Sequence, residues 1–180
     1  VHLLVGQREL VELGLAAGAA GGQAADAGRD AVGHLRGDLD VSALERSLQS
    51  IVRRHESLRT TFPESGDSAR QHIATWQLPE VEVIDLRSLP DEERQAQANG
   101  IVEQAARHPP DLQNGPLLQA RLLRLADDRH LLVFVVHHIV FDGWSMGVFL
   151  HELAHEYAAR ASGSAPPDDK LSLQYGDFAI

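Results

Sequence analysis

The 180-residue chain is 43% hydrophobic, which provides enough apolar material for one compact core but not for several independent domains. Its 16 Lys and Arg residues against 26 Asp and Glu residues give a net charge of -10, which argues against binding nucleic acid through its phosphates. The chain has no Cys, which excludes disulfides, thiolate zinc sites and a cysteine nucleophile. No apolar run is long enough to span a membrane and the start lacks a basic signal region, so we expect a soluble, cytoplasmic chain with no membrane partner.

Residues 1–33 are rich in Ala and Gly and lack a steady hydrophobic period. We interpret them as an atypical N-terminal segment, a weak helix that runs into a flexible connection. The pattern sharpens from Asp38, and either Asp40 or Ser42 can cap a helix. This helix is expected to end near the basic residues 53–55. Its apolar positions fall at helical spacing: Val41, Leu44, Leu48, Ile51 and Val52.

The middle of the chain alternates short extended runs with a helix. Extended runs are predicted at 71–75 and 81–86. Pro90 opens a helix that continues through about residue 106, and a Pro-Pro pair at 109 and 110 stops it.

Two apolar segments, 117–125 and 130–136, flank a short polar turn and predict a β-hairpin. The second contains LLVFVV, which has no polar face, so we place it in the centre of a sheet. A helix is expected over 145–159, a Pro/Ser/Gly linker over 162–170 and renewed order over 171–180. Strands mixed with helices predict an α/β or α+β layered fold, a mixed sheet flanked by helices.

The sequence HHIVFDGWS follows the predicted central strand. Because neighbouring side chains on a strand point to opposite faces, we expect one of His137 and His138 to act as a base in a cleft while the other packs. Asp142 can fix an imidazole or its loop, and Gly143 permits close approach of the backbone to a substrate. No Ser or Cys nucleophile is evident, so direct acyl transfer fits best. From the pattern alone, a pair of buried structural histidines is an equal alternative.

Two other charged patterns have structural explanations. The run RRHESLRTTF at 53–62 holds more charge than a helix end needs, and taken alone it favours a solvated face. HELAH, with His151, Glu152 and His155, fits the HExxH pattern of zinc proteases. Its two imidazoles fall away from the apolar face of the predicted helix, and no third ligand follows at a recognisable spacing. We therefore assign no metal and expect an exposed histidine pair.

Several motifs together resemble one family. RHESLRTTF and HHIVFDGWS resemble the second and third core motifs of condensation domains of nonribosomal peptide synthetases, RHExLRT and HHxxxDG. GDLDVSALERSLQSIV and the final LQYGDFA are also similar to that family, so the resemblance covers about residues 34–180. The family's opening motif, SxAQxxLW, is not matched, since VHLLVGQRELVELGL retains only GQREL.

The resemblance implies a chloramphenicol-acetyltransferase-like fold of two lobes with the active site between them. Residues 34–180 would form the N-terminal lobe, and the C-terminal lobe is expected outside this chain, which leaves the isolated lobe inactive. The implied enzyme is an acyltransferase that joins a carrier-bound aminoacyl or peptidyl thioester donor to an aminoacyl thioester acceptor through an amide bond. Such reactions belong to the biosynthesis of antibiotics and other secondary metabolites.

The resemblance also implies partners and residue roles. Both substrates would be attached to 4′-phosphopantetheine arms of peptidyl carrier domains, next to an adenylation domain, with no directly bound cofactor. His138 would be the catalytic second His of the motif, a base or an orienter of the α-amine, with His137 as its structural partner. Asp142 would be a structural carboxylate paired with Arg59. Gly143 would line the site with its amide near the thioester. The motifs resemble domains for an L-configured donor.

Other readings stay open. Related acyltransferases of the same fold use HxxxDG with a coenzyme A donor, and epimerization domains share HHxxxDG, although RHExLRT and YxDFA favour condensation over both. The other reading is a catalytically inactive condensation-domain remnant that acts in protein-protein interaction. The intact His138, Asp142 and Gly143 argue against that loss of activity.

Overall fold

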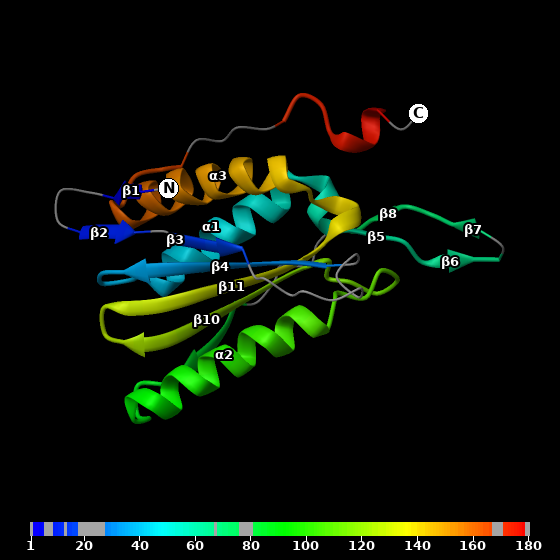
Figure 1. The fold of residues 1–180 in the computed structure, drawn as a ribbon. Coiled ribbons are helices and arrows are strands. Elements are labelled where there is room, and N and C mark those ends of the chain that lie inside the picture. Colours follow the sequence, from blue (N-terminus) through cyan, green and yellow to red (C-terminus); the bar gives the residue numbers. More distant parts are fainter. Residues whose placement is uncertain are drawn as a thin grey trace.

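The computed structural model describes residues 2–5, 9–12, 14–17, 28–66, 68–75, 81–166 and 171–178. Within these ranges, a five-stranded sheet forms the centre in the order β3-β4-β11-β10-β9 (Figure 1). Strand β9 runs parallel to β10, and the other neighbours are antiparallel, so the expected mixed sheet is confirmed. The strands are β3 (Gly14–Ala17), β4 (Gly28–Arg36), β9 (Val81–Asp85), β10 (Leu118–Ala126) and β11 (Arg129–His137).

The hairpin of β10 and β11 confirms the prediction from the apolar segments. Leu118 pairs with Val136, and Leu123 pairs with Leu131. Strand β11 lies third of the five strands, and its residues 130–137 are all buried. A strand that is covered on both faces needs apolar side chains on both, which explains the absence of a polar face in LLVFVV.

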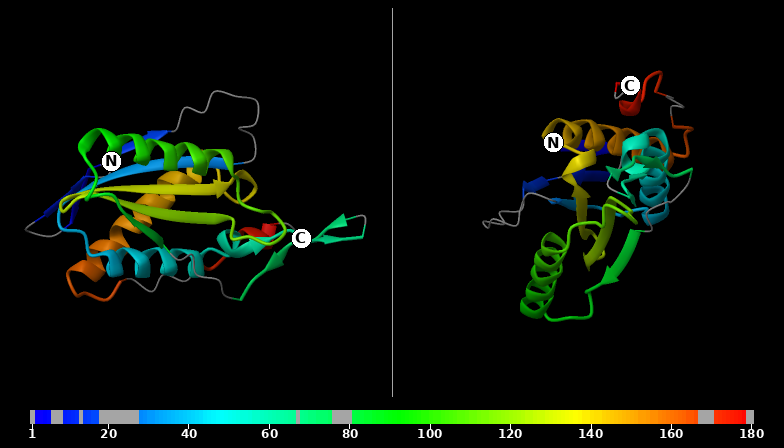
Figure 2. Two further views of the ribbon diagram at one scale, coloured as in Figure 1. Left: turned by 90° about the horizontal axis from the view of Figure 1, so that it is seen from below. Right: turned by 90° about the vertical axis from the view of Figure 1, so that its right-hand side faces the viewer.

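Three α-helices of the described chain cover the two faces of the sheet. They are α1 (Val41–Arg54), α2 (Asp91–Arg107) and α3 (Gly143–Ala161). Helices α1 and α3 lie on one face and α2 lies on the other (Figure 1, Figure 2). Because side chains alternate along a strand, Phe134 packs in the core beneath α1 and α3, whereas Val133 packs beneath α2. None of these helices is long and apolar enough to cross a membrane.

The N-terminal segment differs from the predicted weak helix. Its described parts are strands: β1 (His2–Val5), β2 (Glu9–Glu12), β3 and β4. Strand β4 pairs with β11 along its whole length, from Arg36 opposite Arg129 to Gly28 opposite His137. This pairing with a distant strand outweighs the local composition. Strand β4 also crosses the boundary placed after residue 33. Residues 18–27, within the segment expected to hold a weak helix and a flexible connection, lie outside the described residues.

Helix α1 begins as predicted, with Asp40 as its cap. The Asp40 carboxylate accepts a hydrogen bond from the Ala43 amide at 2.9 Å, and the Asp40 amide donates to the Tyr157 hydroxyl of α3 at 3.1 Å. The bond to Tyr157 joins the start of α1 to the later turns of α3. Short elements complete the fold: η1 (Glu56–Arg59), β5 (Thr60–Thr61), β6 (Glu64–Ser65), β7 (Ser68–Ala69), β8 (His72–Ile73), η2 (His138–Val140) and η3 (Tyr175–Phe178).

Candidate active site

His137 ends the central strand β11, and it is 9% exposed. Its Nδ1 accepts a hydrogen bond from the Ile139 amide at 3.2 Å, so the proton of the neutral ring lies on Nε2. Its amide donates to the carbonyl of Leu117 at 2.9 Å. Burial lowers the pKa of His137, and the neighbouring His138 lowers this pKa further. His137 is therefore a packed, neutral residue that fixes the end of the strand.

His138 begins the turn η2 directly after the strand, and its side chain is exposed. The carbonyl of His138 accepts a hydrogen bond from the Phe141 amide at 3.4 Å, which closes the turn. The two neighbouring histidines thus have different surroundings, because His137 ends the strand and His138 already belongs to the turn. The imidazole of His138 is therefore accessible from solvent, whereas the imidazole of His137 is buried.

Asp142 and Gly143 form the junction between this turn and α3. The Asp142 carboxylate caps α3 by accepting hydrogen bonds from the amide and the hydroxyl of Ser145, at 2.8 and 2.7 Å. The bond from the Ser145 amide is the main cause that lowers the pKa of Asp142, and the hydroxyl lowers it further. Gly143 is the first residue of α3, so its amide points out of the positive end of the helix dipole.

The predicted ion pair between Arg59 and Asp142 is not formed in the structure. Arg59 ends η1, where its Nη1 donates to the Ala74 carbonyl at 2.6 Å and its Nη2 pairs with Glu56 at 3.1 Å. Asp142 is engaged at the start of α3 instead, because the Ser145 amide and hydroxyl are local donors that need no distant partner. The structure therefore brings together His137, His138, Asp142 and Gly143, and no hydrogen bond or ion pair joins Arg59 to them.

An open pocket lies beside this junction, between the end of α1, η1 and the start of α3. Phe141 packs edge-on against Phe149 at 5.8 Å, as expected of a core residue. Trp144 is 83% exposed at the pocket, although an aromatic residue beside a buried strand more often packs in the core. It follows the helix cap by two residues, and the buried face of α3 is supplied by later residues such as Phe149. The pocket is lined by Ile51, His55, Ser57, Leu58, Val140, Phe141, Trp144, Ser145, Val148 and Phe149.

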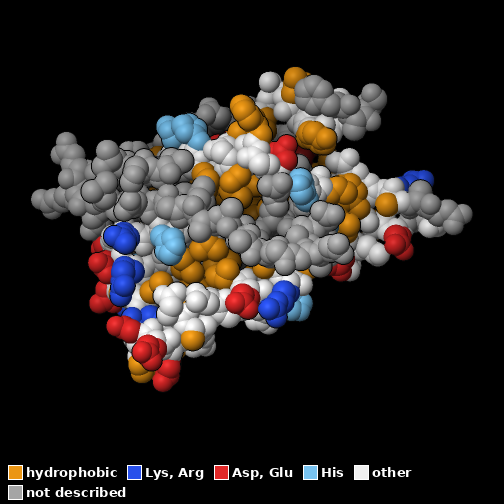
Figure 3. Space-filling view, in the orientation of Figure 1, with side chains coloured by type: hydrophobic (Ala, Val, Ile, Leu, Met, Phe, Trp, Pro, Cys, Tyr) orange, Lys and Arg blue, Asp and Glu red, His pale blue; other side chains and the backbone are white. Residues whose placement is uncertain are grey.

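Charged side chains gather elsewhere on the face drawn in Figure 3, at the lower left, where α2 and the turn of the hairpin lie. Arg87, just after β9, pairs with Asp85 and with Asp127 of the hairpin turn, both at 2.6 Å. Hydrophobic side chains appear in the middle of this face and near the C-terminal segment (Figure 3).

The charged residues of RRHE and HELAH depart from the sequence interpretation. Arg54 and Glu152 form an ion pair at 2.8 Å between α1 and α3, and His55 Nε2 also binds Glu152, at 2.9 Å. The predicted solvated face is therefore wrong for Arg54 and His55. His151 and His155 are exposed as predicted, with ring centroids 4.4 Å apart. Among the described residues, no group of three or more His, Asp or Glu side chains is placed to hold a metal ion.

Comparison with known proteins identifies the family. Residues 28–180 match the Condensation domain family. The chain is 44% identical over 139 residues to the phosphinothricin tripeptide synthetase PhsC of Streptomyces viridochromogenes, a match that covers 77% of this chain and 13% of that synthetase. It is 34% identical to the X-domain solved in complex with OxyB from teicoplanin biosynthesis, with a TM-score of 0.74 over 85% of this chain and 32% of that one. The starter condensation domain of the rhizomide synthetase RzmA gives 26% identity and a TM-score of 0.69, over 79% of this chain and 34% of that one.

The fold and the His-His-Asp-Gly junction thus occur in a chain that belongs to the condensation domains of nonribosomal peptide synthetases. Its layered α+β architecture is the chloramphenicol-acetyltransferase-like fold of that family. The chain spans about a third of the solved condensation-type chains and a small part of the synthetase that it matches.

Proposed function

We propose that this chain is the N-terminal lobe of an enzyme that forms amide bonds in nonribosomal peptide synthesis. The donor is an aminoacyl or peptidyl thioester and the acceptor is an aminoacyl thioester, each on the 4′-phosphopantetheine arm of a peptidyl carrier domain in the cytoplasm. A C-terminal lobe completes the site, and an adenylation domain supplies activated amino acids. The observation that supports this proposal most strongly is the exposed His138 at the end of β11, beside the Asp142–Gly143 start of α3.

In the proposed reaction, the α-amine of the acceptor attacks the carbonyl carbon of the donor thioester. A C–N bond forms, the C–S bond breaks, and the proton lost by the amine ends on the thiol of the donor arm. His138 acts as the base or the orienter of the amine. The Gly143 amide, at the positive end of α3, donates to the oxygen on which negative charge develops.

The other site residues have supporting roles in this proposal. His137 keeps the end of β11 in place through its bond from the Ile139 amide. Asp142 fixes the start of α3 through Ser145. Arg59 ties η1 to the segment after β8 through the Ala74 carbonyl, and acts separately from Asp142.

The test is to detect the product on the acceptor arm. In the full polypeptide that contains this chain, both carrier domains are loaded with amino acids of different mass, and the arms are analysed by mass spectrometry. We expect a condensed dipeptidyl arm in the wild type and an unmodified acceptor arm in His138→Ala. His151→Ala, a change to an exposed histidine of α3, is the matched control and should retain product. The same amount of product in His138→Ala as in the wild type would refute the proposal.

Recruitment of a partner protein is the second candidate, because the X-domain of similar fold was solved as a complex with OxyB. It predicts stable binding of a separate protein and no condensed product in either the wild type or His138→Ala. Transfer from an acyl coenzyme A in place of a donor carrier would instead favour the related HxxxDG acyltransferases. The three readings therefore give different products with the same protein.

A further inference from the structure

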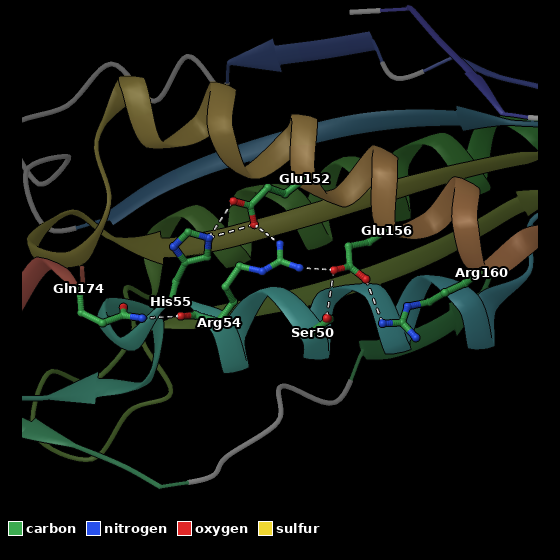
Figure 4. Close-up of polar contacts among 7 residues, drawn as sticks. All are labelled: Ser50, Arg54, His55, Glu152, Glu156, Arg160 and Gln174. Atoms are coloured by element: carbon green, nitrogen blue, oxygen red, sulfur yellow. Dashed lines mark hydrogen bonds and ion pairs between the residues drawn. The ribbon is translucent and has the colours of Figure 1, made fainter. Parts of the chain in front are cut away.

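A network of charged side chains joins α1 to α3 (Figure 4). Arg54 donates from Nη1 to Glu152 at 2.8 Å and from Nη2 to Glu156. His55 Nε2 contacts both oxygens of Glu152, at 3.0 and 2.9 Å. Glu156 also accepts from Arg160 at 2.9 Å, so each carboxylate has two charged or ionisable partners.

The network is largely shielded from water. The side chains of Arg54 and Glu156 are 11% and 2% exposed. Burial lowers the pKa of Arg54, but hydrogen bonds and charges from Glu152 and Glu156 outweigh it and raise this pKa above its ordinary value. Burial likewise raises the pKa of Glu152, and His55 and Arg54 outweigh it, so this pKa is lowered. The charges therefore stay paired across the interface between the two helices.

A third segment of the chain is bound to the same place. Gln174 Nε2 donates to the Arg54 carbonyl at 2.9 Å, and Gln174 Oε1 accepts from the Glu56 amide at 3.1 Å. Gln174 belongs to LQYGDF, just before η3. Three of the four segments that resemble condensation domains thus meet at Arg54: RHESLRTTF, the helix that follows HHIVFDGWS, and LQYGDFA.

We propose that Arg54, Glu152 and Gln174 are positioning residues for the condensation site. They hold α3 at one height and one rotation against α1, and the start of α3 carries the Asp142–Gly143 junction that faces the substrate. This inference rests on the proposed function, and it assigns a role in that function to Arg54 of RHESLRTTF, Gln174 of LQYGDFA and Glu152 of α3.

The geometry of a helix explains how contacts at Glu152 can affect the position of Gly143. Glu152 lies nine residues beyond Gly143, about 14 Å along a helix that rises about 1.5 Å per residue. Apolar contacts such as Phe149 on Phe134 hold the helix on the sheet, but such contacts are non-directional. The two nitrogens of one guanidinium bound to carboxylates on successive turns fix both the height and the rotation of α3.

Arg54→Lys is the most informative variant, because it keeps the charge but removes the fork that reaches both carboxylates. In the full polypeptide, hydrogen exchange measured by mass spectrometry should become about tenfold faster in peptides covering 138–150 and stay unchanged in the hairpin of β10 and β11. The single-turnover rate of amide formation should fall about 10- to 100-fold while the KM for the carrier domains stays the same. Arg107→Lys, on an exposed pair of α2, is the matched control and should change neither.

Two milder variants keep the test conclusive if Arg54→Lys folds poorly. Glu152→Gln retains the shape of the side chain, and Gln174→Ala removes the contact of LQYGDF without touching the charges. Both should give the same local increase in exchange and the same fall in rate. Unchanged exchange over 138–150 in the folded variants, or an increase spread equally over the hairpin, would overturn the positioning role.

The two readouts separate this inference from the proposed function. Hydrogen exchange needs no substrate, so it reports on the position of α3 even if the wild type makes no amide. If the wild type makes no amide and the variants still exchange faster over 138–150, the proposed function is refuted. The link between the network and the start of α3 is then still supported. A normal rate in a variant with faster exchange would remove the positioning role and leave the proposed function.

Discussion

The carboxylate of Asp142 accepts hydrogen bonds from both the amide and the hydroxyl of Ser145, at 2.8 and 2.7 Å. Asp142 is the residue that the family resemblance pairs with Arg59, and in the structure its carboxylate is used for this helix cap. Because Asn caps helices about as well as Asp, Asp142→Asn should keep the thermal midpoint close to that of the wild type, whereas Asp142→Ala should lower it. Scanning calorimetry of the variants checks this, and equal midpoints for Asn and Ala would contradict the capping role.

Arg59 and Asp142 have separate partners, so the effects of replacing them should add. Arg59→Ala removes the bonds to Ala74 and Glu56, and Asp142→Ala removes the bonds from Ser145. Residues without shared contacts usually give additive changes in stability. We expect the double variant to show the sum of the two single losses. A double variant no worse than the worse single one would mean that the two residues act as a pair.

Glu156 is the most buried charge of the network, and its loss should destabilise the domain strongly. Glu156→Leu leaves the partly buried Arg54 and Arg160 without that carboxylate, which should cost about 3–5 kcal/mol of unfolding free energy. Glu103→Leu, on an exposed pair with Arg107, should change it by less than about 1 kcal/mol. Urea unfolding of both variants checks the difference. Similar losses at the two positions would contradict the stabilising role of the network.

His130 should make the domain sensitive to acid. Burial is the main cause that lowers its pKa, and the charges of Arg124 and Arg87 lower it further. Its Nδ1 is also buried without a hydrogen-bond partner. Because the pKa of His130 is lower in the native state than its ordinary value of 6.5, the unfolded chain takes up the proton first as the pH falls. The neutral ring therefore stabilises the native state fully above pH 6.5, and this stabilisation is lost as the pH falls through the lowered pKa.

We therefore expect the thermal midpoint to fall as the pH is lowered below the ordinary histidine pKa of 6.5, and to fall less in His130→Leu. The pKa of His137 is also lowered, so His137 accounts for part of the fall in midpoint that remains in His130→Leu. Calorimetry at several pH values compares the two slopes. Parallel slopes for the wild type and His130→Leu would show that His130 does not contribute.

The HELAH sequence should have no part in metal chemistry. Glu152, the potential base of such a motif, is bound to Arg54 and His55 on the inner side of α3, while His151 and His155 are exposed. We expect amide formation to be unchanged in the double variant His151→Ala and His155→Ala. Stoichiometric zinc retained by the wild type after dialysis, and lost together with activity in His155→Ala, would contradict this assignment.

Local patterns predicted the elements that depend on local properties. The helix predicted over 91–106 is found at Asp91–Arg107, and the one predicted over 145–159 is found at Gly143–Ala161. The hairpin follows from two apolar segments and a polar turn. Hydrophobic periodicity and helix caps lie within a few residues of each other, so one sequence is enough to detect them.

Features that depend on distant partners escaped prediction. Strand β4 forms against β11, which lies about a hundred residues later, and no local pattern of Ala and Gly reports that pairing. Arg54 and Glu152 are separated by 98 residues, so each looks like a solvated charge when read alone. The spacing of Glu152 and Glu156, one helical turn apart next to the apolar Leu153, is a signal that could have indicated a carboxylate face turned inward.

The central claim is that His138 acts on the substrate while His137 maintains the structure. The measurement that tests it most directly is the single-turnover rate of amide formation in the full polypeptide, taken beside the thermal midpoint, for His138→Ala and His137→Ala. We predict that His138→Ala loses about 10²–10⁴-fold in rate with an unchanged midpoint, and that His137→Ala lowers the midpoint. A His138→Ala variant that keeps the wild-type rate would contradict the claim. So would a His138→Ala variant whose thermal midpoint falls as much as that of His137→Ala.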